Sequence, residues 1–481
     1  MSLFQAAVSG SPAASFDTPR ANLPDMTRYS MTRPMGFAGR QTTQAILSKS
    51  ARVFEPGQPI QFDIAATNGF LDPRSTFLKF TVKVTYPSVN GVDAASAKNK
   101  ARVQQMWLDT SAHSCIEQLR IISQAGDELE LIDGYGRLVN ALSSVQVSKD
   151  ERKLASLQIQ GYDSPIFERD HTVVVANTVA QKVVAKTFCI PLYGSGILGP
   201  NAHKFWPLCL SPLILEMRLS NDFMIGISDA QAVAVGGVGN TGARMSWVTV
   251  EQPTLYASVA QYDDIQIPNT LKSLVLQQNT PLFMTTTSWR KVPAQEFSNA
   301  GPYSVPINDK LRSVRSIFGT ASKKNPGLEK RTYESINAKL TNFQLLVGAA
   351  YMPNQPMRDD QEVIVETLRS LNEYPSLLHS AGCDLASWKR EDSSTGAAVG
   401  VDADAVSILS EDVNGFTVGL DLEAVHGSNG LINGQNFIEN QPVTFSFESG
   451  TTVPNGAYMH LYLNYDLIIS FSIDGRTVRI A

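Results

Sequence analysis

The sequence predicts an all-β protein made of two tandem antiparallel β-sandwiches with long loops and a few short helices. Three observations support this fold class. Apolar and polar residues alternate along several segments, as they do in strands with one buried face. Helical spacing of apolar residues is sparse. The two halves of the chain repeat the same order of parts.

The alternation of apolar and polar residues predicts four strands most clearly. In residues 78–86, 213–219 and 443–447 every second side chain is apolar and the side chains between them are mostly polar. The longest run covers residues 459–473 and places eight apolar side chains at odd positions. Because side chains alternate between the two faces of a strand, these odd positions should face a core. The turn at Asp474-Gly475 should then lead into a last short strand.

Two segments predict short helices. Apolar residues recur at helical spacing in residues 130–144, at Ile132, Tyr135, Val139 and Leu142, and in residues 358–375, at Ile364, Leu368 and Leu371. Asp359 and Asp360 suit the start of the second helix, because carboxylates interact favourably with the helix dipole there. Two short helices among many strands indicate helices within loops and not βαβ units.

The order of predicted strands and helices indicates an internal duplication. Leu119 lies 69 residues before Phe188, and Gln344 lies 72 residues before Phe416. The next interval, to the following strand, is 25 residues in the first half and 27 in the second. Agreement within three residues over two intervals is typical of duplicated domains. Two similar all-β domains with long inserted loops predict tandem jelly rolls, which together form a double jelly roll.

The chain length and local composition predict the domain boundaries. A chain of 481 residues exceeds what one hydrophobic core usually organises. We expect an N-terminal arm at 1–52, a first jelly roll at 53–265 and a second at 266–481. The arm has no sustained period and carries six basic residues against two acidic ones. It could touch nucleic acid weakly or lie over a neighbouring subunit, and we expect it to order only on assembly.

The composition narrows the class of partner. Charged residues make up 18% of the chain, below the roughly 25% of ordinary soluble domains. Such a chain has a large core or covers much of its surface with partners. The net charge of -5 gives no overall attraction to nucleic acid or anionic lipid. No apolar run is long enough to suggest a membrane span, and the first residues do not resemble a signal peptide.

Several local motifs resemble functional sites but lack a feature that each site requires. Gly237 to Gly242 spells G-x-G-x-x-G, but no helix pattern follows to receive a phosphate. Ser195 lacks the preceding glycine of a nucleophile elbow. Asp263-Asp264 suits a solvated linker, and Trp206 suits a core or interface position. The six histidines show no metal-ligand spacing and the four cysteines favour buried free thiols: His113, His171, His203, His379, His426, His460, Cys115, Cys189, Cys209 and Cys383. We therefore expect no enzyme activity and no catalytic, cofactor or metal residues.

Four segments carry a resemblance to a known family. Residues 69–84, 121–142, 310–319 and 342–372 are similar to segments of the double jelly-roll major capsid proteins of adenovirus-like and Polinton- or virophage-like DNA viruses. The resemblance implies homotrimeric capsomers of pseudo-hexagonal outline that tile an icosahedral shell in the virion, with the long loops outside. It also implies a vertex (penton) protein and minor capsid proteins as partners. The family supplies no catalytic residues.

Two other functions remain open on the sequence. A tandem β-sandwich could bind carbohydrate or process glycosides, in which case exposed aromatic side chains would line a groove. Hydrolysis would add two acids about 5–10 Å apart. A capsid subunit of an RNA virus is the other alternative, and it would usually need a more strongly basic arm than this one.

Overall fold

The structure is a computed structural model of the full chain. It describes residues 39–86, 107–108, 111–147, 159–161, 182–200, 202, 204–221, 224–225, 248–262, 266–276, 281–324, 333, 335–337, 339–371, 388, 416–424, 432–438, 441–450, 456–471 and 477–480. Of the predicted features, the G-x-G-x-x-G segment, Asp263-Asp264, the Asp474-Gly475 turn, Cys383 and four histidines (His171, His203, His379 and His426) lie outside these residues.

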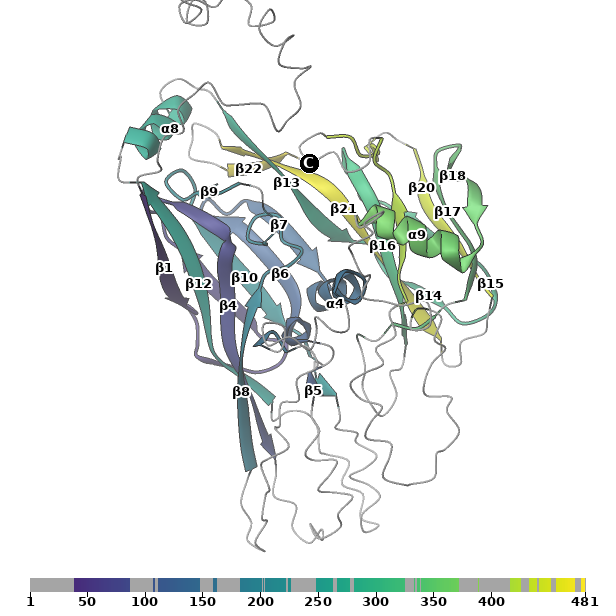
Figure 1. The fold of residues 1–481 in the computed structure, drawn as a ribbon, viewed down its shortest axis with the longest axis horizontal. Coiled ribbons are helices and arrows are strands. Elements are labelled where there is room, and N and C mark those ends of the chain that lie inside the picture. The colour runs from purple at the N-terminus through teal and green to yellow at the C-terminus, as the bar shows by residue number, and fades with distance from the viewer. Residues whose placement is uncertain are drawn as a thin grey trace, which may run out of the picture.

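The strands between residues 39 and 262 form two antiparallel sheets (Figure 1). The first, here the β12 sheet, has the order β1 (Gly39–Leu47), β12 (Val248–Tyr262), β4 (Phe70–Tyr86), β8 (Lys182–Pro191). The second, the β10 sheet, has the order β3 (Pro59–Ile64), β10 (Leu213–Leu219), β6 (Ile116–Ser123), β7 (Glu128–Asp133). Short strands flank them: β2 (Val53–Phe54), β9 (Trp206–Pro207), and the pair β5 (Trp107–Leu108) and β11 (Met224–Ile225).

The strands between residues 282 and 480 repeat this arrangement. The β21 sheet has the order β13 (Leu282–Lys291), β21 (Ala457–Phe471), β16 (Val314–Lys323), β19 (Val418–Asp421). The β20 sheet has the order β15 (Gly301–Ile307), β20 (Val443–Ser449), β17 (Leu340–Val347), β18 (Ala350–Met357). β14 (Gln295–Phe297) and β22 (Thr477–Ile480) pair with β21.

Both sets of strands have the jelly-roll topology, so the predicted fold class and the predicted duplication are confirmed. In each half the first strand pairs with the last long strand, and four strands of each sheet follow one another in the same chain order. Alternate residues of β10 and of β20 are buried, which places one face of each sheet on a core. We refer to the two halves as the first and the second jelly roll.

The helices differ from the predictions in detail. A 3-10 turn, η2 (Ala112–Cys115), precedes β6, and α4 (Tyr135–Gln146) follows β7. The predicted helix began at Ile132, which instead belongs to β7. α8 (Gln266–Leu276) follows β12 and begins at the predicted start of the second domain, where no helix was predicted. α9 (Asp360–Ser370) begins at the predicted residue, with Asp359 at its N-cap position.

The buried face of α9 is not the predicted one. Ile364 and Leu368 are half-buried, while Val363, Glu366, Thr367 and Ser370 are buried. The reason is a close approach to β19: a Cβ on Gly419 would lie 2.1 Å from Ser370 Oγ and 2.9 Å from Thr367 Cα. Small side chains and a glycine let the backbones meet, so the apolar stripe lies on the flank of the helix.

Two strands, β1 and β21, add detail to the expectations. The segment predicted to be an arm, residues 1–52, contributes β1, which pairs with β12 from Gly39↔Tyr262 to Leu47↔Thr254. In β21 the odd positions from Met459 to Phe471 are buried as predicted, but His460, Tyr462 and Asp466 on the other face are buried too. That face is covered because the first jelly roll and the loop at 432–438 pack against it.

Leu463 tests the position of β21 in the core. It is fully buried, so Leu463→Asp would place an unpaired charge in an apolar site at a cost of several kcal/mol. This is comparable to the whole stability of about 5–15 kcal/mol of a typical domain. We expect loss of soluble protein and of the cooperative thermal transition.

The control for this variant is Phe283→Asp on the neighbouring strand β13. Phe283 is 56% exposed, so the same charge there should leave the melting temperature within a few degrees of the wild type. Equal stability of the two variants would contradict the placement of Leu463.

Candidate functional site

The junction between the two jelly rolls is the most elaborate polar site that the structure describes. β7 and α4 of the first jelly roll meet β13, β21 and β22 of the second (Figure 1). One continuous cluster of buried apolar side chains runs through both jelly rolls and across this junction. The two sandwiches therefore share a core, and their relative orientation is set by side-chain packing.

A buried carboxylate, Glu130, lies at the centre of the junction. It projects from β7 and is fully buried. Its oxygens accept hydrogen bonds from Ser195 Oγ (2.6 Å), from the backbone N–H of Gly196 (2.8 Å) and from Ser288 Oγ of β13. Ser195 and Gly196 belong to the first jelly roll and Ser288 to the second. Since a buried carboxylate is costly unless its oxygens are paired, these donors hold both sandwiches to one point.

Burial raises the pKa of Glu130, and the hydrogen bonds from Ser195, Ser288, Gly196 and Ile197 oppose this rise without cancelling it. The folded protein therefore binds a proton at Glu130 more tightly than the unfolded chain does.

The backbones approach closely beside Glu130. Thr286 Oγ1 of β13 donates to the carbonyl oxygen of Gly196 at 2.8 Å. A Cβ on Gly196 would lie 2.1 Å from the carbonyl oxygen of Thr287, so glycine is required here. The turn at 192–198 thus lies directly on β13.

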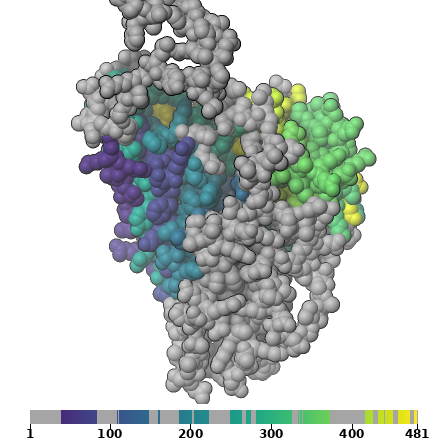
Figure 2. Space-filling view, in the orientation of Figure 1, coloured from purple at the N-terminus to yellow at the C-terminus, as the bar shows by residue number. Residues whose placement is uncertain are grey.

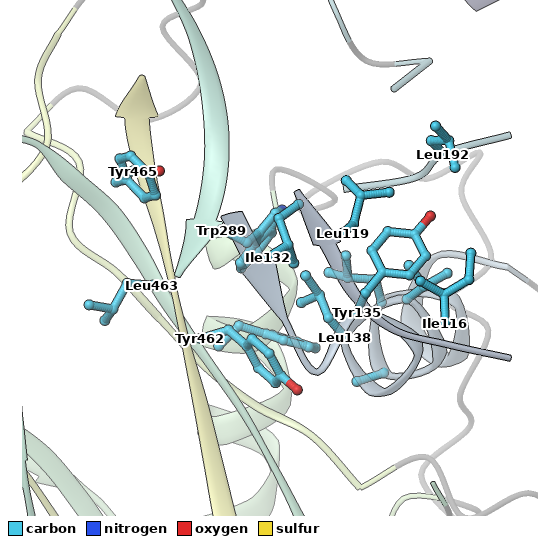
Figure 3. Packing of buried hydrophobic residues seen from close by; sticks show 14 of the residues in the cluster. Ile116, Leu119, Ile132, Tyr135, Leu138, Leu192, Trp289, Tyr462, Leu463 and Tyr465 are labelled. Carbon is cyan, nitrogen blue, oxygen red and sulfur yellow. The ribbon is translucent and has the colours of Figure 1, made fainter. Parts of the chain in front are cut away.

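Aromatic side chains complete the contact on either side of Glu130. Tyr462 of β21 points towards α4 and donates from its hydroxyl to the carbonyl oxygen of Gly134, at 3.1 Å, just before that helix (Figure 3). Trp206 of the first jelly roll meets Phe471 of the second edge to face, with ring centroids 5.1 Å apart. Such aromatic pairs contribute about 0.5–1.5 kcal/mol beyond their buried area.

Tyr333 of the second jelly roll is anchored on the first. Its hydroxyl donates to Ser220 Oγ at 2.9 Å, and lies 3.2 Å from Glu117 Oε2. Its carbonyl oxygen accepts from Asn140 Nδ2 of α4 at 2.9 Å, and the Arg137 guanidinium stacks 5.4 Å from its ring centroid. Tyr333 therefore fastens the segment before β17 to α4.

Burial lowers the pKa of two basic groups near the N-terminal end of α4. Burial lowers the pKa of Lys291, although Glu117 and Asp133 act against this. Burial also lowers the pKa of His460 well below its usual value, and the positive charges of Arg137 and Lys291 add to this shift. The arrangement is a buried polar network that binds the jelly rolls together.

The rejected motifs give no catalytic arrangement in the described part of the chain. Ser195 is engaged with Glu130 and with the backbone N–H of Leu198. Buried His113 has its pKa lowered to about 3 by desolvation. Cys115 is buried and free, and Cys189 and Cys209 are half-buried and free. Trp206 is fully buried, as predicted for a core position.

The same described residues contain no group of three or more His, Cys, Asp or Glu side chains that could hold a metal ion. Among the helices of this part of the chain, none has both the length and the apolar character to cross a membrane.

The junction was not predicted from the sequence. Glu130 alternates with Leu129 and Leu131 in β7, a pattern that is typical of a solvent-facing carboxylate. One sequence signal could have indicated that Glu130 is buried. Glu130 lies two residues before Ile132, so both side chains project from the same face of β7, and Ile132 is fully buried.

Two jelly rolls in one chain, joined through a shared buried junction, define a double jelly-roll protein. Solved structures that share this fold include viral capsid proteins. The chain resembles the PBCV-1 virus capsid protein with a TM-score of 0.55 at 9% identity, covering 94% of this chain and 99% of that one. It resembles a chain of the Sputnik virophage with a TM-score of 0.57 at 11% identity, covering 95% and 91%.

The Faustovirus major capsid protein matches with a TM-score of 0.53 at 10% identity, covering 97% of this chain and 96% of that one. No protein-family model and no curated protein sequence matches the chain. At such low identity the likeness establishes the double jelly-roll fold over nearly the whole length.

The raised pKa of Glu130 predicts a pH dependence of stability. Because the folded state binds this proton more tightly, the contribution of Glu130 is fully present below the pKa of the unfolded chain, about 4.3. It is lost as the pH rises through the folded value. Glu130→Gln cannot titrate, so the stability of the wild type relative to this variant should fall as the pH is raised from about 4 towards neutral.

The measurement is the free energy of unfolding in urea for both proteins across that range, with circular dichroism to verify that the variant is folded. Parallel pH profiles of the two proteins would contradict the assignment.

Proposed function

We propose that the chain is a viral major capsid protein that self-assembles as homotrimeric, pseudo-hexagonal capsomers into an icosahedral shell. The observation that carries the proposal is the double jelly-roll fold, which matches capsid proteins over 94% or more of this chain. The similarity spans both jelly rolls and the junction between them, and not a single sandwich. On this proposal the protein resides in the virion.

The junction gives the proposal a physical basis. Three copies of a chain with two similar sandwiches present six sandwiches around one axis, so a three-fold object can occupy a six-fold lattice position. This requires the two sandwiches of a chain to keep a fixed orientation. Glu130 accepts hydrogen bonds from both jelly rolls, and Tyr333 and Tyr462 of the second jelly roll bind residues of the first, so the three supply such a connection.

The proposal extends to partners and to the division of the chain. We propose contacts with neighbouring capsomers, a vertex protein and minor capsid proteins, and at most weak contact of the N-terminal arm with nucleic acid. The proposed domains are the arm at 1–52 and jelly rolls at 53–265 and 266–481, with β1 as the point where the arm joins the first sheet. The role is structural and involves no catalysis.

The alternative of a carbohydrate-binding or glycoside-processing protein is not favoured. It would need aromatic side chains exposed along a groove. The three tryptophans whose exposure the structure describes, Trp206, Trp289 and Trp388, are buried at 0%, 7% and 3% exposure. Their rings fill cores and the junction.

Assembly of the purified protein tests the proposal. We expect sedimentation and light scattering to give a species of three times the chain mass of 52.4 kDa, and negative-stain microscopy to show particles of hexagonal outline or closed shells. A species of 52.4 kDa alone, over a range of salt concentrations at micromolar protein, would overturn the proposal.

A further inference from the structure

The two jelly rolls have the same topology but differ in how much of equivalent surfaces is covered. β7 and β18 each end the path of their sheet, and each is followed by a helix, α4 or α9. β7 lies against β13 and β22 of the second jelly roll. All of α4 is buried except Arg137 and Gln146, which are half-buried, because sandwiches pack on both of its sides.

The equivalent surface of the second jelly roll is open. In β18 every residue is exposed or half-buried, and Tyr351 is 50% exposed. α9 packs on β19 and β16 on one side, while Gln361, Glu362, Val365 and Arg369 on its other side are exposed. We call β18 and the outer side of α9 the β18–α9 surface. It is the counterpart of the surface that β7 and α4 bury inside the chain.

The same contrast holds for the strands on the opposite edges. β13 opens the β21 sheet and is covered by β7, so Thr286 and Ser288 are buried. β1 opens the equivalent β12 sheet, and none of its residues is buried. Leu47, at the end of β1, is 56% exposed, and nearby Val53 of β2 is 51% exposed. We call β1 and β2 the β1 surface.

We propose that the β18–α9 surface of one copy packs on the β1 surface of a second copy, repeating between chains the contact that the junction makes within a chain. The proposal rests on the proposed function and specifies the faces through which the capsomer forms. The two surfaces lie on opposite sides of the molecule: purple β1 marks one side and green β18 the other (Figure 2). A contact between unlike surfaces links copies head to tail, and it forms a closed trimer where the rotation from one copy to the next is a third of a turn.

The chemistry of the two surfaces fits a protein–protein contact between copies. β18 (AYMPNQPM) contains no charged residue, and β1 (GRQTTQAIL) contains one, Arg40. Depletion of charge is typical of the core of an interface. On α9, exposed Val365 has half-buried Ile364 and Leu368 beside it, and charged Glu362 and Arg369 lie along the same side of the helix. Leu47 and Val53 give the β1 surface an apolar end.

The position of Leu47 relative to α9 follows from the junction. Within the chain, the end of β13 meets α4: Trp289 and Leu138 both approach Gly194, at 3.7 and 3.6 Å from its notional Cβ, and Lys291 lies beside Gly134. The end of β1 is the counterpart of the end of β13. Leu47 of one copy should therefore face the outer flank of α9 in the next.

The experiment compares two valine variants of the full chain. Val365 and Val478 are 39% and 42% exposed, but Val478 lies on β22, outside both proposed surfaces. We expect Val365→Asp to shift the protein from trimer to monomer, with at least a tenfold loss of trimer at micromolar concentration, and Val478→Asp to remain trimeric. Light scattering coupled to gel filtration measures the masses, and thermal melts verify that both variants fold.

A charge-swap variant tests the facing residue. Leu47→Lys alone should also weaken the trimer, and the double variant Val365→Asp with Leu47→Lys should recover part of it by placing opposite charges together. A trimeric Val365→Asp would overturn the proposed interface, and absence of recovery in the double variant would overturn the pairing of Leu47 with α9. A wild type that is monomeric would instead overturn the proposed function, so the two failures are distinct.

Discussion

The structure depends on one constraint, which is that the open edge of a β-sandwich must be covered. β7 ends its sheet and would expose unpaired backbone groups and the apolar side chains beneath them. The chain meets this need with its own second sandwich, laid against β7 and α4. Burying this contact requires that backbones can approach closely and that buried polar groups have partners. Gly196 allows the close approach. The two serine hydroxyls that donate to Glu130, and the Tyr462 hydroxyl that donates to Gly134, satisfy the buried polar groups.

The two jelly rolls share their strand topology, but the side chains on their equivalent edge strands differ. The β7 position that carries Glu130 pairs with Ile121 of β6, and the matching position of the second jelly roll, Met352, pairs with Leu345 of β17. A carboxylate that needs several donors occupies the edge that is covered within the chain. A thioether that needs none occupies the edge that is open. The difference separates a permanent contact, built at folding, from one that can form between molecules afterwards.

The sequence predicts the sandwiches well because alternation is a local signal. The odd positions of β21 and of β10 are apolar without exception and are buried as expected. β1 was missed because its residues are mostly polar, and its strand conformation comes from pairing with β12, more than 200 residues away. The buried face of α9 was missed because Gly419, on a strand 49 residues beyond Ser370, decides how close the helix can come. Glu130 was missed for the same reason, since its hydroxyl donors lie 65 and 158 residues further along the chain.

The pairing of β1 with β12 bears on how the chain is made. β1, the first strand of the first jelly roll, pairs with residues Thr254 to Tyr262 of β12, which are synthesised much later. In the same way, β13 pairs with β21, which ends ten residues before the end of the sequence. During synthesis at about 5–20 residues per second, β1 therefore stays unpaired for roughly ten seconds or more after it leaves the ribosome. An unpaired strand is less prone to associate with other chains if its side chains are polar. β1 (GRQTTQAIL) has such a composition, with one arginine and five further polar or glycine residues. The polar composition that conceals β1 from pattern recognition is therefore also one that limits association of the unpaired strand until β12 has been made.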